Sequence, residues 1–218
     1  MNLDKSCENW PSEEQILAVE SSPLRICVRS ESDLVLDDFV SSGGPEILLG
    51  HSTPAPVFQA WVEDFNVATG SNIQNVPYNS SGRARRGLLA GDIDAVFITT
   101  SNSNKLLRSG AGRCLATTHP DGEERYDLPA LKNSVDFPFN TLTNVAYYFG
   151  GNLSESETEI LRDFFSEMAS GSNPEMVEYQ KTLDFELRGA DQVGVDGMYE
   201  FMEQVLDTWK PLARLLEK

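Results

Sequence analysis

Residues 47–97 read ILLGHSTPAPVFQAWVEDFNVATGSNIQNVPYNSSGRARRGLLAGDIDAVF, and this stretch decides the fold. Its apolar residues change in turn from the spacing of buried strands to the spacing of amphipathic helices. We expect strands at Glu46–Leu49, Ile73–Tyr78 and Ile93–Thr99, and helices at Pro54–Thr69 and Ser81–Ala90. Strands that alternate with helices over short connections predict an α/β fold with a mainly parallel sheet flanked by helices.

The flanking sequence continues this alternation. Leu24–Val28 has the pattern of a strand, and residues 1–23 are polar and acidic with one weak helical turn at Glu13–Val19. The remaining expected elements are a helix at Ser32–Val40, a helix near Asn104–Ser109, a strand at Arg113–Thr118, a surface loop at His119–Asn140, a strand at Asn144–Phe149, and helices at Ser154–Ser170, Pro174–Leu183 and Gly197–Glu217. Three regions follow: a polar segment at 1–23, an α/β lobe at 24–145, and a C-terminal helical segment at 146–218 that packs on the lobe or crosses from it.

The composition excludes several classes of partner. The 218 residues hold 17 Lys and Arg against 34 Asp and Glu, a net charge of −17, which repels nucleic acid and anionic membranes. The three cysteines are an odd number without a CxxC pair, so we expect idle or buried thiols and no disulfide framework. With two histidines we expect neither a metal site nor a cofactor. The N-terminus lacks the pattern of a signal peptide, which predicts a cytoplasmic protein if it is the natural start.

Polar residues gather where the predicted strands end. In parallel sheets, ligands bind beyond the carboxyl ends of the strands, and the first N–H groups of a helix favour anions. We therefore expect an anion site at this edge. Its candidate ligand-binding residues are Gly50, His51, Ser52, Thr53, Tyr78, Asn79, Ser80, Ser81, Thr99 and Thr100.

Some of these residues have structural alternatives. Ser52 or Thr53 could be a helix cap, His51 a partly exposed loop residue, and Tyr78 a packing residue.

Four blocks of this chain carry a family resemblance: LGHST at 49–53, VPYNS at 76–80, LLAGDIDAVF at 88–97 and CLATT at 114–118. They resemble the strand–GSSG–helix, VPY, GqvDvmf and lAvts segments, in that order, of the substrate-binding proteins of tripartite tricarboxylate transporters, the Bug family. The resemblance runs from about Leu24 to the C-terminus. It implies a periplasmic-binding-protein-like lobe that binds a small carboxylate through Ser52 and Thr53, without catalysis.

The same resemblance implies a periplasmic location and membrane transporter subunits as partners. The family begins with a first lobe that carries a glycine-rich loop, and residues 1–23 are too few to build one. We therefore expect a truncated form whose first lobe is largely missing, and a homo-oligomer formed through the surface that this lobe would cover.

Two other functions remain open. One is a protein-interaction module that has lost ligand binding. The other is a serine hydrolase, since Gly50-His51-Ser52 resembles the start of a nucleophile elbow, with Asp94 and His119 completing a triad. Pro54 stands where that motif has its second glycine, which weighs against the hydrolase.

Overall fold

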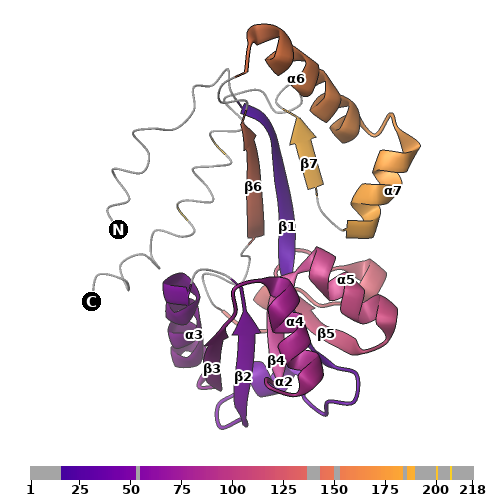
Figure 1. Ribbon diagram of the computed structural model, residues 1–218. Helices are drawn as coiled ribbons and strands as arrows, with labels where there is room; N and C mark the ends of the chain where they lie inside the picture. Colours follow the sequence, from indigo (N-terminus) through magenta and orange to yellow (C-terminus); the bar gives the residue numbers. More distant parts are fainter. Residues whose placement is uncertain are drawn as a thin grey trace. The chain divides into compact units, whose positions relative to one another are not determined.

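The computed structural model describes residues 16–52, 55–136, 143–149, 153–183 and 186–189, together with Glu200 and Asp207. The described residues form two compact units, and strand β1 (Ile16–Arg29) has residues in both (Figure 1). Residues from Ser22 to Asn144 belong to the larger unit, and those before Ser22 and after Asn144, up to Glu200, belong to the smaller unit. None of the described helices is long and apolar enough to cross a membrane.

A mixed sheet forms the centre of the larger unit. Its strand order is β3-β2-β4-β1-β5, where the new strands are β2 (Glu46–His51), β3 (Asn72–Pro77), β4 (Ala95–Thr99) and β5 (Gly112–Thr117). Strand β2 is parallel to both β3 and β4, whereas β1 is antiparallel to β4 and β5. The sheet is therefore mainly parallel with β1 inserted against the others, which confirms the predicted class.

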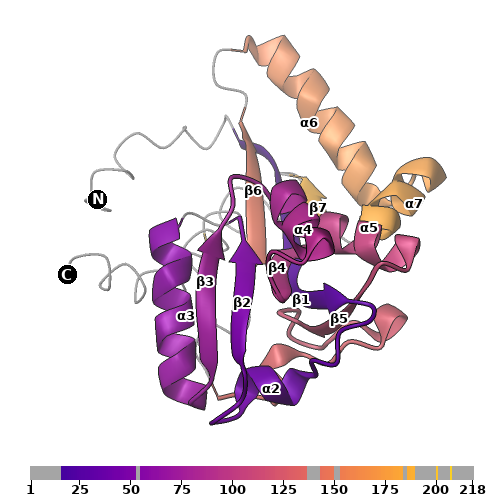
Figure 2. The ribbon, with the colours of Figure 1, turned by 60° about the horizontal axis from the view of Figure 1, so that its bottom comes forward.

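Helices cover both faces of this sheet (Figure 2). They are α2 (Leu36–Val40), α3 (Ala55–Thr69), α4 (Ser81–Ala90) and α5 (Thr100–Ser109). On one face, Ile26 and Val28 of β1 join a core with the aromatic stripe Phe58, Trp61 and Phe65 of α3. On the other face, the alternate β1 residue Cys27 packs with Leu88 of α4 and Leu106 of α5. This alternation is the period of two expected of a strand buried on both sides.

Local signals set the ends of α4, which spans the predicted residues. The side chain of Ser80 accepts a hydrogen bond from the Arg83 backbone N–H, and Gly91 ends the helix in the left-handed conformation at φ 82°. Helix α5 begins at Thr100, earlier than the expected Asn104, because its first turn follows β4 without a loop.

The expected surface loop after β5 is partly folded into the core. It contains two short 3₁₀ helices, Glu124–Tyr126 and Leu131–Asn133, and it buries Leu128, Ala130 and Leu131. The segment is therefore only in part a surface loop.

The smaller unit contains the first residues of β1 and two acidic helices. Strand β6 (Thr143–Phe149) pairs with β1, and β7 (Glu186–Gly189) is antiparallel to residues 18–21 of β1. Helix α6 (Glu155–Ser170) begins with a capping box of Ser154 and Glu157, and α7 spans Pro174–Leu183.

Two expectations about this unit need comment. The weak helical turn expected at Glu13–Val19 is wrong for its described part, since Ile16–Val19 lies in β1. The expected helix at Gly197–Glu217 lies outside the described residues apart from Glu200 and Asp207, both of which are helical.

Candidate functional site

The structure brings two of the predicted site residues into contact. Ser52 directly follows β2, and Ser81 is the first residue of α4, which follows β3. Because β2 and β3 are parallel neighbours, their carboxyl ends meet at one edge. There the hydroxyl oxygens of Ser52 and Ser81 lie 2.6 Å apart, and both residues are partly buried. Two of the residues proposed as ligand-binding therefore form a hydroxyl pair at this edge.

Other predicted site residues lie at the ends of β3 and β4. Asn79 and Ser80 precede α4 and are exposed, and Ser80 caps the helix. Thr99 is the last residue of β4 and is partly buried, with its hydroxyl accepting a hydrogen bond from Asn102 Nδ2 at 3.3 Å. Thr100, by contrast, is buried within the start of α5. The edge thus presents hydroxyls and the first turn of α4, whereas Thr53 lies outside the described residues.

His51 belongs to the core instead of the exposed loop proposed as its structural alternative. Its ring is fully buried and stacks on Phe58 with 3.9 Å between the ring centroids. Its Nε2 atom forms a hydrogen bond with the side-chain oxygen of Asn75 on β3. These contacts make His51 a link between β2, β3 and α3.

Tyr78 fits between two glycines. A Cβ atom on Gly50 would lie 3.2 Å from Tyr78 Cε2, and one on Gly87 would lie 2.3 Å from the Tyr78 hydroxyl oxygen. Burial, with a smaller contribution from the charge of Asp92, raises the pKa of Tyr78. Gly50 and Tyr78 therefore serve packing beneath α4, which is the structural alternative stated for Tyr78.

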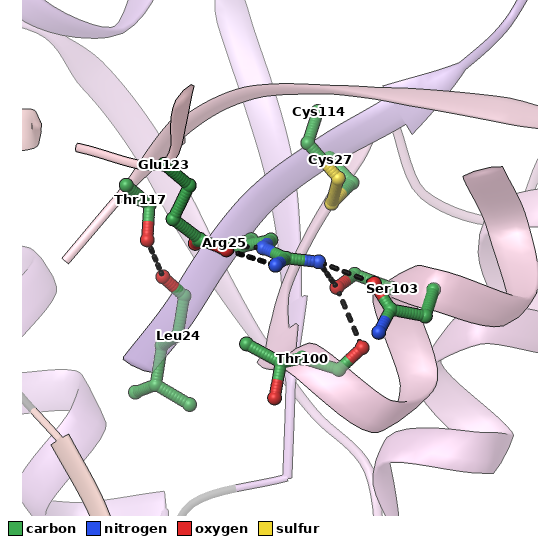
Figure 3. Close-up of a disulfide and its surroundings, with 9 residues drawn as sticks. Leu24, Arg25, Cys27, Thr100, Ser103, Cys114, Thr117 and Glu123 are labelled. Carbon is green, nitrogen blue, oxygen red and sulfur yellow. Dashed lines mark hydrogen bonds and ion pairs between the residues drawn. A yellow bond between two sulfur atoms is a disulfide. The ribbon is translucent and has the colours of Figure 1, made fainter. Parts of the chain in front are cut away.

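A buried arginine cluster was missed by the sequence analysis (Figure 3). Arg25 of β1 is fully buried, and its guanidinium forms two hydrogen bonds with the carboxylate of Glu123, one of them from Nε at 2.8 Å. Its Nη1 atom donates to the side-chain oxygens of Ser103 at 3.0 Å and Asn104 at 2.6 Å, both on α5.

The ring of Tyr126 completes the cluster, since the guanidinium carbon of Arg25 lies 4.4 Å from the ring centroid. The cluster lies near the carboxyl ends of two strands, because Arg25 is the register partner of Ile98 on β4 and of Thr117 on β5. Its positive charge is neutralised by Glu123. A ligand at this edge would therefore meet a paired arginine, not an isolated cation.

One sequence signal could have found this cluster: an arginine within the apolar run Leu24–Val28. A charged residue inside a strand buried on both faces requires a partner. The partner itself could not be named, because it lies 98 residues away in an acidic loop with several carboxylates.

The expectation about the cysteines was wrong. Cys27 of β1 and Cys114 of β5 are joined by a disulfide, 87 residues apart in the sequence (Figure 3). They are register partners on adjacent strands, which brings their side chains together. An odd count of three cysteines does not exclude one pair, and Cys7 lies outside the described residues.

The structure does not assemble the triad that a hydrolase would need. Asp94 precedes β4 and Ser52 follows β2, so these residues lie at opposite ends of two parallel strands. Each of the three residues has another partner: Asp94 accepts from the Leu48 N–H, Ser52 bonds Ser81, and His119 Nδ1 accepts from the Asp121 N–H. Within the described residues, Ser52 thus lacks the acid proposed for it.

Comparisons with solved structures agree with this fold. A TctC solute binding protein from Polaromonas matches with a TM-score of 0.59 and 15% identity, over 93% of this chain and 68% of that one. Rpa4515 of R. palustris with adipate matches with a TM-score of 0.68 and 19% identity, over 92% and 67%. MatC from Rhodopseudomonas palustris with bound malate matches with a TM-score of 0.67 and 11% identity, over 94% and 71%.

At these identities the likeness concerns the fold. No family model and no curated protein matches the chain. The predicted resemblance is nonetheless confirmed in three dimensions over more than nine tenths of the chain. The chain has the periplasmic-binding-protein-like fold of the solute receptors of tripartite tricarboxylate transporters.

Proposed function

We propose that this protein is a solute receptor that binds a small carboxylate at the carboxyl edge of β2, β3 and β4. The hydroxyls of Ser52 and Ser81 and the first turn of α4 would contact the carboxylate, and Thr99 would border it. Neither catalysis nor a cofactor is part of the proposal. By analogy with the TctC receptors, its partners would be membrane transporter subunits, and it would be located in the periplasm.

The observation that carries the proposal is the Ser52–Ser81 contact. Two hydroxyls from different loops lie 2.6 Å apart at the edge where ligands bind in open α/β sheets. A carboxylate has two acceptor oxygens, so two adjacent O–H donors could each serve one of them. The likeness in fold to the structures with adipate and with malate supports this choice of ligand class.

Charge and hydrogen bonding limit the affinity that such a site can reach. With a net charge of −17, the protein does not attract an anion at long range. Each hydrogen bond to a charged group contributes about 1.5–3 kcal/mol, and a helix N-terminus adds about 0.3–1 kcal/mol. Because 1 mM binding corresponds to about 4 kcal/mol, we expect affinities closer to millimolar than to nanomolar.

Thermal stability in the presence of malate, adipate and citrate would test the proposal. A ligand that binds only the folded state raises the melting temperature. The parent is compared with Ser52→Ala and Ser81→Ala, and with Ser109→Ala at the C-terminal end of α5 as the control. We expect one of these carboxylates to stabilise the parent and the control but neither site variant. Equal stabilisation of all four proteins would contradict the site.

One observation favours the second candidate function, a protein-interaction module. Ile160 and Phe164 lie one helical turn apart on α6, with exposed fractions of 67% and 47%. Exposed apolar side chains at helical spacing suit contact with another protein chain. Light scattering, which reports the mass of the particles in solution, would test it on the parent and on Ile160→Glu. If α6 contacts another chain through its apolar side chains, the charged variant should lose that contact and its mass should fall.

A further inference from the structure

The outer sides of α4 and α5 form a basic surface. These helices lie side by side on one face of the sheet, where Leu88 and Leu106 pack in the same apolar cluster (Figure 1). They hold five of the 17 basic residues of the chain and none of its 34 acidic residues. Four of the five are exposed, and we call these four the basic surface: Arg83, Arg86, Lys105 and Arg108.

The basic surface is not neutralised by neighbouring carboxylates. None of its four side chains forms an ion pair with a residue that the structure describes. The acids that follow α4 in the sequence are Asp92 and Asp94, and Asp94 accepts a hydrogen bond from the Leu48 N–H. Beside the arginines, Leu89 exposes 45% of its surface, three residues after Arg86. An uncompensated positive charge with an apolar side chain thus lies on the outside of a protein whose net charge is −17.

Helix α6 carries the opposite charge. Its five acidic residues are all exposed, and its one basic residue, Arg162, is partly buried. Exposed apolar residues lie between the acids: Ile160 and Phe164 recur with Glu157 and Glu167 at intervals of three or four residues, which places them on one side of the helix. We call this side the acidic surface, formed by Glu157, Ile160, Asp163, Phe164 and Glu167.

The two surfaces complement each other in charge, and both include exposed apolar side chains. Complementary charges favour the orientation in which opposite signs meet, and apolar side chains gain by leaving water. Two copies with a net charge of −17 repel each other at long range, but at physiological ionic strength exposed charges more than about 8 Å apart are largely screened. Contacts between the basic surface of one copy and the acidic surface of another are shorter than this distance and remain attractive.

We propose that a second copy of this chain binds through these surfaces, with the acidic surface of one copy on the basic surface of the other. A pair of copies related by a two-fold axis would form this contact twice. The contact involves few exposed side chains and is smaller than the interface of a stable dimer, so the association depends on protein concentration. This inference names the occupant of the α6 surface that the second candidate function leaves open, and it does not depend on carboxylate binding.

Sedimentation equilibrium of the full chain at about 0.15 M salt would test the proposal. One variant reverses the basic surface, Arg86→Glu/Lys105→Glu/Arg108→Glu, and another reverses the acidic surface, Asp163→Lys/Glu167→Lys. We expect the average mass of the parent to rise above that of one chain as its concentration increases. Each variant alone should keep the mass of one chain, because its two surfaces now carry the same sign. An equal mixture of the two variants should associate again, since each reversed surface faces an oppositely reversed one.

A matched control separates the surfaces from the net charge. Glu46→Lys/Glu63→Lys makes the same change in net charge as the acidic-surface variant, at exposed positions on β2 and α3, and should associate like the parent. Three results would overturn the proposal: a parent with the mass of one chain at every concentration, a reversed variant that associates like the parent, or a mixture that does not associate although the parent does. The masses are measured without a carboxylate, so a failure of carboxylate binding would change none of them.

Discussion

Two polar clusters near the carboxyl edge of the sheet differ in charge and burial. The Arg25 cluster holds a full positive charge, but it is buried and is neutralised by Glu123. The Ser52–Ser81 pair carries no formal charge and is only partly buried. The cation therefore pairs with the protein's own loop, and the uncharged hydroxyls are the groups that we propose for an anionic ligand. A residue's charge alone does not identify a binding site.

The largest effect is expected from breaking the buried ion pair. Glu123→Gln keeps the shape of the side chain but removes the negative charge that pairs with the guanidinium of Arg25. We expect the free energy of unfolding, measured with denaturant, to fall by about 3–5 kcal/mol. Glu124→Gln is the matched control, because its side chain is exposed, and we expect a change within about 0.5 kcal/mol. Similar values for both variants would show that the ion pair does not stabilise the fold.

The next effect concerns the packing of Tyr78. Gly87→Ala would place a Cβ atom 2.3 Å from the Tyr78 hydroxyl oxygen and force the ring to move. We expect a loss of about 1–3 kcal/mol in the free energy of unfolding. The control is Gly82→Ala in the same helix, where a Cβ atom meets nothing within 4 Å and should stabilise by up to about 1 kcal/mol. A stabilising Gly87→Ala would mean that Tyr78 is free to turn toward a ligand.

The pH dependence of stability should also report on Tyr78. Burial raises its pKa, so folding favours the neutral phenol over the phenolate. This contribution is complete below the unfolded pKa of about 10 and is lost as the pH rises through the folded value. Tyr78→Phe should therefore lose less stability than the parent between about pH 9 and 11, in parallel denaturant titrations. Identical slopes would argue against burial of the hydroxyl.

The smallest effect on stability is expected at the proposed ligand site. Ser52→Ala removes one hydroxyl from a partly buried pair, and we expect the free energy of unfolding to change by about 0.5–1.5 kcal/mol or less. Circular dichroism melts of the unliganded variants would measure it. A much larger loss would show that the Ser52–Ser81 hydrogen bond stabilises the fold and is not primarily a ligand-binding group.

The sequence predicted the sheet and its helices well where patterns are local. The strand that ends at Thr99 is a run of buried apolar residues. The helix at 81–90 has local signals at both ends, the Ser80 cap and the Gly91 stop. Strand β7 was missed because four residues with two charges, Glu186 and Arg188, show no clear strand pattern. The early start of α5 was missed because Thr, Ser and Asn are weak helix formers.

The arrangement of the candidate site residues could be predicted only in part, for a related reason. Ser52 and Ser81 could be placed together because parallel strands end at a common edge. His51 and Tyr78 face the core, which depends on contacts with Phe58, Asn75 and Gly87 that no local pattern specifies. The Arg25–Glu123 and Cys27–Cys114 pairs join residues 98 and 87 positions apart, and such partners are fixed only by the tertiary fold.

The most direct test of the proposed function is a double-mutant cycle on binding. Isothermal titration with the carboxylate that stabilises the parent would be carried out on Ser52→Ala, Ser81→Ala and the double variant. If both hydroxyls hold one carboxylate, each single variant should weaken binding about 10-fold or more, and the double variant should lose less than the sum of the two free energies. Unchanged dissociation constants in all three variants would contradict the site.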